Sequence, residues 1–308
     1  MNTIHSVAIL GAGAVGAYFA RSFFDASDFS TVLIAKGERF ERLTENGIVI
    51  NGKPYKFPVL DPEKASSPVD LIIVALKHHH LEDALKGLDK LIGDSTIILS
   101  VMNGLDSENY IGSLYGMDKV LYGISLAIDS VREGNQVNYI SPGTHYFGEM
   151  TNAEFTPRVL RVKDAFERAG IAYKIPLDMI RFMWWKFMIN VGVNQASAVM
   201  RAPYAVMQGS QSAQALMEAL MREVIALAEA VGVDLTSHDI EEWYPALNSL
   251  SPQGKTSMLQ DMEAGRKTEG DIFGGKVVEL GQLHGIATPV NQTIVQIIDV
   301  LEQGAIQP

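Results

Sequence analysis

The sequence predicts an α/β domain over residues 1–174, followed by an all-α domain over residues 175–308. In the first part, short runs of Val, Ile and Leu alternate with helix-like stretches, a pattern typical of parallel strands that are buried on both faces. From about Leu177 the apolar residues take helical spacing and strand-like runs stop. Pro176 lies between the two patterns and marks the expected boundary.

The predicted elements follow in chain order. We expect four buried strands in the first domain, at residues 6–10, 31–35, 71–76 and 96–101. A hairpin or pair of edge strands is expected at residues 123–128 and 136–140, because Gly134 lies in a turn-like segment between them. In the second domain we expect helices at residues 179–200, 212–230, 260–264 with their flanks, and 274–284.

The composition is that of a globular chain, with 47% apolar and 20% charged residues among 308. A net charge of −11 argues against a nucleic-acid or anionic-membrane partner. The absence of cysteine excludes disulfides, thiolate metal sites and a cysteine nucleophile. No apolar run is long enough to span a bilayer, and the first residues do not resemble a cleavable leader. We therefore expect a cytoplasmic protein.

A glycine-rich loop connects the first predicted strand to the helix-like residues 14–24. The first glycine allows a tight turn, the second allows a pyrophosphate to approach the backbone, and the third allows the helix to pack on the strand. The pattern and its context predict a Rossmann-type dinucleotide-binding domain, although an ordinary turn or a site for an S-adenosyl donor has the same local pattern. The loop residues are Gly11, Ala12, Gly13, Ala14, Val15 and Gly16.

The end of the second strand favours NADP over NAD. An NAD site usually has an acidic residue there, which bonds the ribose hydroxyls, whereas this strand ends at Lys36. A lysine attracts a 2′-phosphate. Arg39 and Arg42 are interpreted either as assisting it or as solvated helix charges, and the nearby Glu38 keeps NAD open as an alternative.

Two polar residues follow buried strands at the edge where the cofactor is expected. Lys77 follows the third strand and Asn103 the fourth. Individually, Lys77 fits a snorkelling surface lysine and Asn103 a plain Asn-Gly turn, but their shared position favours a role in binding. The neighbouring trio, His78 to His80, is interpreted as solvated, and we expect no metal site.

In the helical half, Lys186, Asn190 and Asn194 are spaced i, i+4, i+8 and form a polar stripe on a helix that is otherwise apolar. A lysine on an apolar helix requires an explanation, because burial disfavours its charged form. The stripe fits either a satisfied core network or helix interface, or a substrate site with a proton-transferring lysine and two orienting amides.

A second polar cluster lies further along the chain. Ser257 opens one helical pattern, and Thr268 is placed to cap the next, with Glu269 and Asp271 in its first turn. Helix capping alone explains these residues as well as a binding site does. The Met- and Ala-rich faces of residues 213–230 fit either a homodimer interface or buried core.

Taken together, these motifs resemble the ketopantoate reductase family over essentially the whole chain. The order and spacing of the motifs carry the resemblance, which is more specific than any one of them. They are the loop from Gly11 to Gly16, Leu76-Lys77, Asn103-Gly104, the Lys186/Asn190/Asn194 stripe, Ser257 to Asp261, and Thr268-Glu269-x-Asp271.

The resemblance implies an NADPH-dependent oxidoreductase that reduces 2-dehydropantoate, a small 2-keto acid, to (R)-pantoate for pantothenate synthesis. It implies Lys186 as the general acid and Glu269 as an acid near the cofactor ribose and the substrate. Asn103 matches a residue that touches both ligands, and Asn190, Asn194 and Ser257 match substrate-orienting positions. The loop residues bind the cofactor, with Lys36 and Lys77 near the 2′-phosphate.

Three positions depart from the family pattern. Lys36 stands where many members have arginine, while Gly254 and Tyr204 stand where some members carry asparagine. A roomier pocket at Gly254 would fit a D-2-hydroxy acid dehydrogenase for another branched or aromatic substrate. A further alternative is a non-catalytic NADP-sensing protein, which would have no need of the proton donor Lys186.

Overall fold

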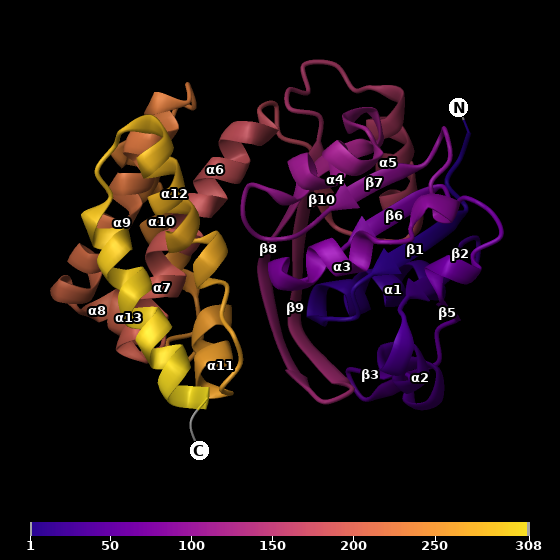
Figure 1. Cartoon of the computed structure of the whole chain (residues 1–308), viewed down its shortest axis with the longest axis horizontal. Helices are drawn as coiled ribbons and strands as arrows, with labels where there is room; N and C mark the ends of the chain where they lie inside the picture. The colour runs from indigo at the N-terminus through magenta and orange to yellow at the C-terminus, as the bar shows by residue number, and fades with distance from the viewer. Residues whose placement is uncertain (1, 307–308) are drawn as a thin grey trace. The chain divides into compact units, whose positions relative to one another are not determined.

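The computed structural model describes residues 2–306. Two compact units divide the chain, Met1–Met179 and Ile180–Pro308, so the division falls slightly beyond the boundary expected from the sequence. The first unit is an α/β domain and the second consists of helices (Figure 1). Among residues 2–306, no helix combines the length and the apolar composition needed to cross a membrane.

The first unit is built on one mixed sheet with the strand order β4-β3-β9-β8-β7-β6-β1-β2-β5, and β10 pairs with β9. The strands from β5 to the start of β8 are parallel, while β8 and β9 form a long antiparallel hairpin. The strands are β1 (Ser6–Leu10), β2 (Ser30–Ile34), β3 (Ile48–Ile50), β4 (Lys53–Tyr55), β5 (Val59–Leu60), β6 (Leu71–Val74), β7 (Ile97–Ser100), β8 (Val120–Glu133), β9 (Gln136–Gly148) and β10 (Tyr173–Lys174).

Helices cover both faces of the parallel strands, as the continuous apolar runs predicted. Val7 and Ile9 of β1 point into a core shared with α1 and α5, whereas Ala8 and Leu10 point into a second core shared with α3 and α4. Each strand alternates its side chains between these two cores. The helices are α1 (Ala14–Asp25), α2 (Gly37–Asn46), α3 (Leu81–Leu85), α4 (Ser107–Tyr115) and α5 (Pro157–Arg168).

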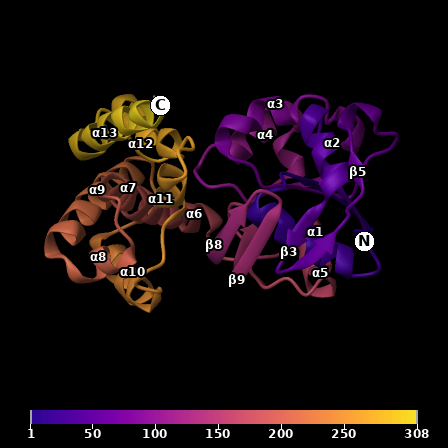
Figure 2. The ribbon, with the colours of Figure 1, turned by 90° about the horizontal axis from the view of Figure 1, so that it is seen from below.

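The predicted hairpin is confirmed, with its turn between Glu133 and Gln136, but both strands are much longer than the sequence indicated. Much of β8 and β9 is only partly buried, so their apolar signal is weak, and Pro142-Gly143 resembles a strand end. The hairpin continues through a register shift at Asp129/Ser130 and through Gly143, whose φ is +76°. It lies against α1 and pairs with β3 (Figure 2).

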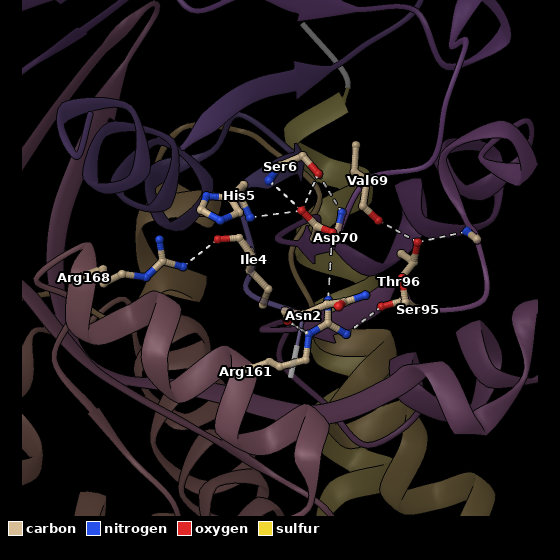
Figure 3. Close-up of polar contacts among 11 residues, drawn as sticks. Asn2, Ile4, His5, Ser6, Val69, Asp70, Ser95, Thr96, Arg161 and Arg168 are labelled. Carbon is tan, nitrogen blue, oxygen red and sulfur yellow. Dashed lines mark hydrogen bonds and ion pairs between the residues drawn. The ribbon is translucent and has the colours of Figure 1, made fainter. Parts of the chain in front are cut away.

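A polar network fixes the amino ends of the central strands (Figure 3). The Asp70 carboxylate accepts hydrogen bonds from the backbone N–H groups of His5 (3.0 Å) and Ser6 (2.9 Å) and from the Ser6 hydroxyl (2.8 Å). Burial acts to raise the Asp70 pKa, but these bonds and Arg161 hold it below its ordinary value. The network joins β1 to β6 at the end of the sheet opposite the glycine loop.

The second unit contains eight α-helices, a π-helical segment and a short 3₁₀ helix among its described residues, and no strand. The sequence predicted one helix from 179 to 200, but a π-helix over Asn190–Asn194 interrupts it. The helices are α6 (Met179–Ile189), α7 (Gln195–Met200), α8 (Tyr204–Gly209), α9 (Gln211–Ala230), α10 (Ser237–Ser249), α11 (Ser257–Glu263), α12 (Gly274–His284) and α13 (Pro289–Ile306).

Candidate functional site

The glycine loop has the geometry of a phosphate cradle. Gly11 has a φ of +114°, and a Cβ on it would lie 2.3 Å from the Ala75 carbonyl oxygen. A Cβ on Gly16 would lie 1.8 Å from the Gly11 carbonyl oxygen, so both positions require glycine. A Cβ on Gly13, in contrast, would meet nothing within 4 Å. Gly13 is the N-cap of α1 and offers no side-chain hydrogen bond, so the first N–H groups of α1 have no side-chain cap.

The carboxyl ends of β1, β6 and β7 bring three predicted features to one edge of the sheet. The ladder continues beyond the strands, because Ala75 N–H donates to the Leu10 carbonyl (2.9 Å) and Val101 N–H to the Val74 carbonyl (3.0 Å). Lys77 and Asn103 follow directly and are both partly buried. The glycine loop, Lys77 and Asn103 therefore lie at the edge where a doubly wound sheet binds its ligand.

Lys36 is engaged elsewhere in the domain. It lies two residues beyond the end of β2 and is the N-cap of α2. Its Nζ lies 2.9 Å from Oε1 of Glu63 and donates to the Lys86 carbonyl (2.8 Å). Glu63 is 27 residues further along the chain, and no spacing rule links the two. Lys36 thus has an exposed carboxylate partner and a backbone carbonyl partner within the protein.

The histidine trio forms a short 3₁₀ helix, His78–His80, at the partly exposed rim of the domain. Within the described part of the chain, no three His, Asp or Glu side chains are placed to hold a metal ion.

In the helical unit, the polar stripe runs along α6 into the π-helix. Lys186 lies on α6, and Asn190 (4% exposed) and Asn194 (9%) begin and end the π-helical turn. π-turns are rare and occur frequently at functional sites, because they widen the helix locally and redirect its side chains. The structure therefore keeps the three residues on one continuous helix, in a segment whose backbone is not regular.

Lys186 has an electrostatic environment suited to proton transfer. Burial lowers its pKa from 10.5 to about 8, and the Glu269 carboxylate acts against burial by favouring the charged form. Glu269 is 8% exposed and precedes the short 3₁₀ helix Gly270–Ile272. The structure thus brings together the two residues named as catalytic, although 83 positions of sequence separate Lys186 from Glu269.

Local contacts account for part of the second cluster, although the N-cap of the 3₁₀ helix Gly270–Ile272 is Glu269 and not the predicted Thr268. The Thr268 hydroxyl accepts from Gly270 N–H (3.1 Å), and Asp271 pairs with Lys267 (2.6 Å). Thr256, and not Ser257, caps α11 through Leu259 N–H (3.1 Å). Ser257 is exposed at the start of α11, a helix that packs against α7 and the π-helix. Capping therefore does not explain Ser257.

Residues that spacing did not reveal support the π-turn. Gln195 is fully buried and donates through Nε2 to the Val191 carbonyl (2.8 Å) and to Asn291 Oδ1 (2.9 Å). Gly192 allows α9 to approach, since a Cβ there would lie 2.6 Å from Cγ of Met221. The signal available in the sequence was weak: one glutamine and one glycine in an apolar helix.

Gly254 does not widen a pocket, which corrects the interpretation of that position. A Cβ on Gly254 would lie 3.0 Å from Cδ2 of Tyr204 and 3.0 Å from the Ser251 carbonyl oxygen. Tyr204 N–H also donates to the Gly254 carbonyl (3.0 Å). A side chain at this position would press against the aromatic ring, which occupies the space beside the glycine.

Comparisons with known proteins agree with this architecture. The sequence model described as "Ketopantoate reductase PanE/ApbA" matches residues 7–152, and that described as "Ketopantoate reductase PanE/ApbA C terminal" matches residues 178–302. A "2-dehydropantoate 2-reductase" of Halobacterium salinarum is 25% identical over 302 residues, covering 96% of this chain and 99% of the relative.

Two solved structures share the fold. A D-mandelate dehydrogenase with NADH and anilino(oxo)acetate superimposes with a TM-score of 0.88 at 22% identity, covering 97% of this chain and 99% of the other. A dimeric ketopantoate reductase from Staphylococcus aureus superimposes with a TM-score of 0.82 at 20% identity, with the same coverage. At these identities the two likenesses establish the architecture alone.

Proposed function

Because the chain belongs to the ketopantoate reductase family, an oxidoreductase family, we propose that it reduces 2-dehydropantoate to (R)-pantoate with NADPH. One observation carries the proposal: a lysine on a polar stripe, with its pKa lowered to about 8, is placed beside a buried carboxylate. A lysine of this kind is expected in a site that must donate a proton near neutral pH.

The reaction needs a proton at the carbonyl oxygen of the 2-keto acid. When bound, the nicotinamide nucleotide supplies the hydride to the carbonyl carbon. The Lys186 ammonium stabilises the negative charge that develops on the oxygen and then donates its proton, so that a hydroxyl forms and the lysine is left neutral. A pKa of about 8 keeps Lys186 mostly protonated at pH 7, yet makes it a better proton donor than an ordinary lysine.

The surrounding residues have supporting roles in this proposal. Glu269 holds Lys186 in its charged form before the reaction, because its carboxylate opposes the effect of burial. Asn190, Asn194 and Ser257 orient the keto acid through hydrogen bonds.

In the first unit, the cradle from Gly11 to Gly16 fits the pyrophosphate, since Gly13 leaves space beside unsatisfied N–H groups. Lys77 and Asn103 contact the same nucleotide.

A second candidate is a D-2-hydroxy acid dehydrogenase that acts on an aromatic keto acid. The packing of the Tyr204 ring on Gly254 favours this candidate, because the ring places an aromatic surface where some family members carry an amide. The D-mandelate dehydrogenase neighbour has the same architecture. The Lys186 and Glu269 pair disfavours the third alternative, a non-catalytic NADP sensor, since sensing needs no proton donor.

We further propose that the protein works in the cytoplasm. The dimeric ketopantoate reductase among its neighbours supports a homodimer, which light scattering tests.

Turnover of purified protein tests the function. Oxidation of NADPH is followed with 2-dehydropantoate, pyruvate, 2-ketoisovalerate and phenylglyoxylate, each repeated with NADH. We expect the highest kcat/KM for 2-dehydropantoate with NADPH. A preference for phenylglyoxylate would establish the second candidate, and nucleotide binding without turnover of any keto acid would establish the sensor.

A further inference from the structure

Three arginines from two separate elements of the first unit, α2 and β8, gather beside the glycine loop. Arg39 and Arg42 lie three residues apart on α2, so they occupy neighbouring positions on its surface. Arg132 lies near the end of β8, and its side chain donates to the Ala12 carbonyl in the loop and to the Gly134 carbonyl (3.1 Å). The long hairpin thus carries a guanidinium from residue 132 to the loop at residue 12.

The three guanidinium groups interact with one another. Burial lowers the pKa of Arg132, and Arg39 and Arg42 lower it further. The pKa of Arg39 is lowered in the same way, mainly by burial and to a smaller extent by the charge of Arg42. The pKa of His80 is lowered mainly by burial, and then by the charges of Arg39 and Lys77. Lys77 therefore lies in the same neighbourhood as Arg39.

This cluster lacks the compensation that Lys36 has. Among residues 2–306, no carboxylate forms an ion pair with Arg39, Arg42 or Arg132, whereas Lys36 pairs with Glu63 at 2.9 Å. Like charges held together without a counterion raise the energy of the protein and attract an anion. A phosphate group that entered the cluster would relieve this repulsion.

The geometry points to Arg39, Arg42 and Arg132, in place of Lys36, as the residues that hold the 2′-phosphate of NADP and select it over NAD. The assignment rests on the proposed use of NADP. The cluster lies where β2 passes into α2 and where the hairpin meets the loop, which is the region of the adenosine ribose in a dinucleotide-binding domain. Guanidinium groups bind phosphate through paired hydrogen bonds, which one lysine ammonium cannot match.

Titration of the full-length protein with NADPH and NADH, without a keto acid, tests the assignment. We compare the wild type with Arg39→Gln/Arg42→Gln, Arg132→Gln and the matched control Lys36→Gln. The double variant is expected to weaken NADPH binding by about 10- to 100-fold per arginine and to leave the Kd for NADH unchanged. Arg132→Gln should weaken the binding of NADPH more than the binding of NADH. Lys36→Gln should change the preference for NADPH over NADH less than about 3-fold.

An unchanged Kd for NADH shows that the α2 double variant is folded with an intact loop, and urea denaturation checks the folding of Arg132→Gln, whose side chain contacts the loop itself. If the arginine double variant keeps the NADPH preference, or if Lys36→Gln abolishes it, the assignment is overturned while the proposed reductase function stands. If the wild type binds NADH more tightly than NADPH, both the assignment and the use of NADP are wrong. Failure of the wild type to reduce any keto acid is a separate result, which refutes the reductase function and leaves the binding assignment standing.

Discussion

Replacing Lys186 with methionine is expected to make the protein more stable and to remove its reductase activity. The charged lysine is held in an environment that lowers its pKa from 10.5 to about 8. At about 1.4 kcal/mol per pH unit this difference corresponds to about 3 kcal/mol of folding free energy. Since Lys186 is partly exposed, we expect a gain of about 1–3 kcal/mol at pH 7 for Lys186→Met.

The gain should depend on pH in a defined direction. Below pH 8, Lys186 is charged in both the folded and the unfolded chain, so the folded protein bears the full free-energy cost of burying that charge. Between pH 8 and 10.5 the folded chain loses its proton first, and the cost disappears as the pH rises. The advantage of the methionine variant should therefore be greatest at pH 7 and vanish above pH 10.5.

Urea denaturation at several pH values measures the free energy of unfolding, and NADPH oxidation measures turnover. Lys56→Met, at an exposed lysine, is the matched control and should change neither quantity. NADPH binding by Lys186→Met should be close to that of the wild type. A variant that is less stable than wild type at pH 7, or a gain that persists at pH 11, would refute the electrostatic reasoning.

Three further predictions follow from the same contacts. Glu269→Gln should move the alkaline limb of the kcat/KM profile to lower pH, because Lys186 loses the carboxylate that favours its charged form. Burial lowers the pKa of His145 from 6.5 to about 4, so the unfolded chain takes up a proton at a higher pH than the folded chain does. The free energy of unfolding should therefore fall as the pH drops from 6.5 to about 4. In urea denaturation, His145→Gln should reduce this dependence on pH. Gly16→Ala should lower stability by about 1–3 kcal/mol or more, because its Cβ would collide with the Gly11 carbonyl 1.8 Å away.

Each of these changes has a matched control. Glu263→Gln, at an exposed carboxylate, should leave the pH profile in place; a shift equal to that of Glu269→Gln would argue against the pairing. His284→Gln, at an exposed histidine, should retain the acid-side loss of stability. Gly13→Ala meets no atom within 4 Å, so it should fold normally but bind NADPH more weakly, by filling the phosphate space. Normal NADPH binding by Gly13→Ala would contradict the cradle.

The sequence predicted well those features that depend on neighbours along the chain. The strand before Gly11 and the helix after Gly16 follow from a local apolar run and from local glycine geometry, and the structure has both. The order of the motifs from Gly11 to Glu269 indicated the family, which the family comparisons confirm. The hairpin was underestimated because partly buried strands give a weak apolar signal, and α8, α10 and α13 were not predicted.

By itself the sequence determined the two-part architecture, the glycine loop and the polar stripe that starts at Lys186, because local periodicity and spacing encode them. Only the tertiary structure decided that Lys36 pairs with Glu63, that Arg132 reaches Ala12 and that Tyr204 fills the space at Gly254. These contacts join residues 27 to 120 positions apart. They depend on loop closure and side-chain packing, which no spacing along the chain specifies.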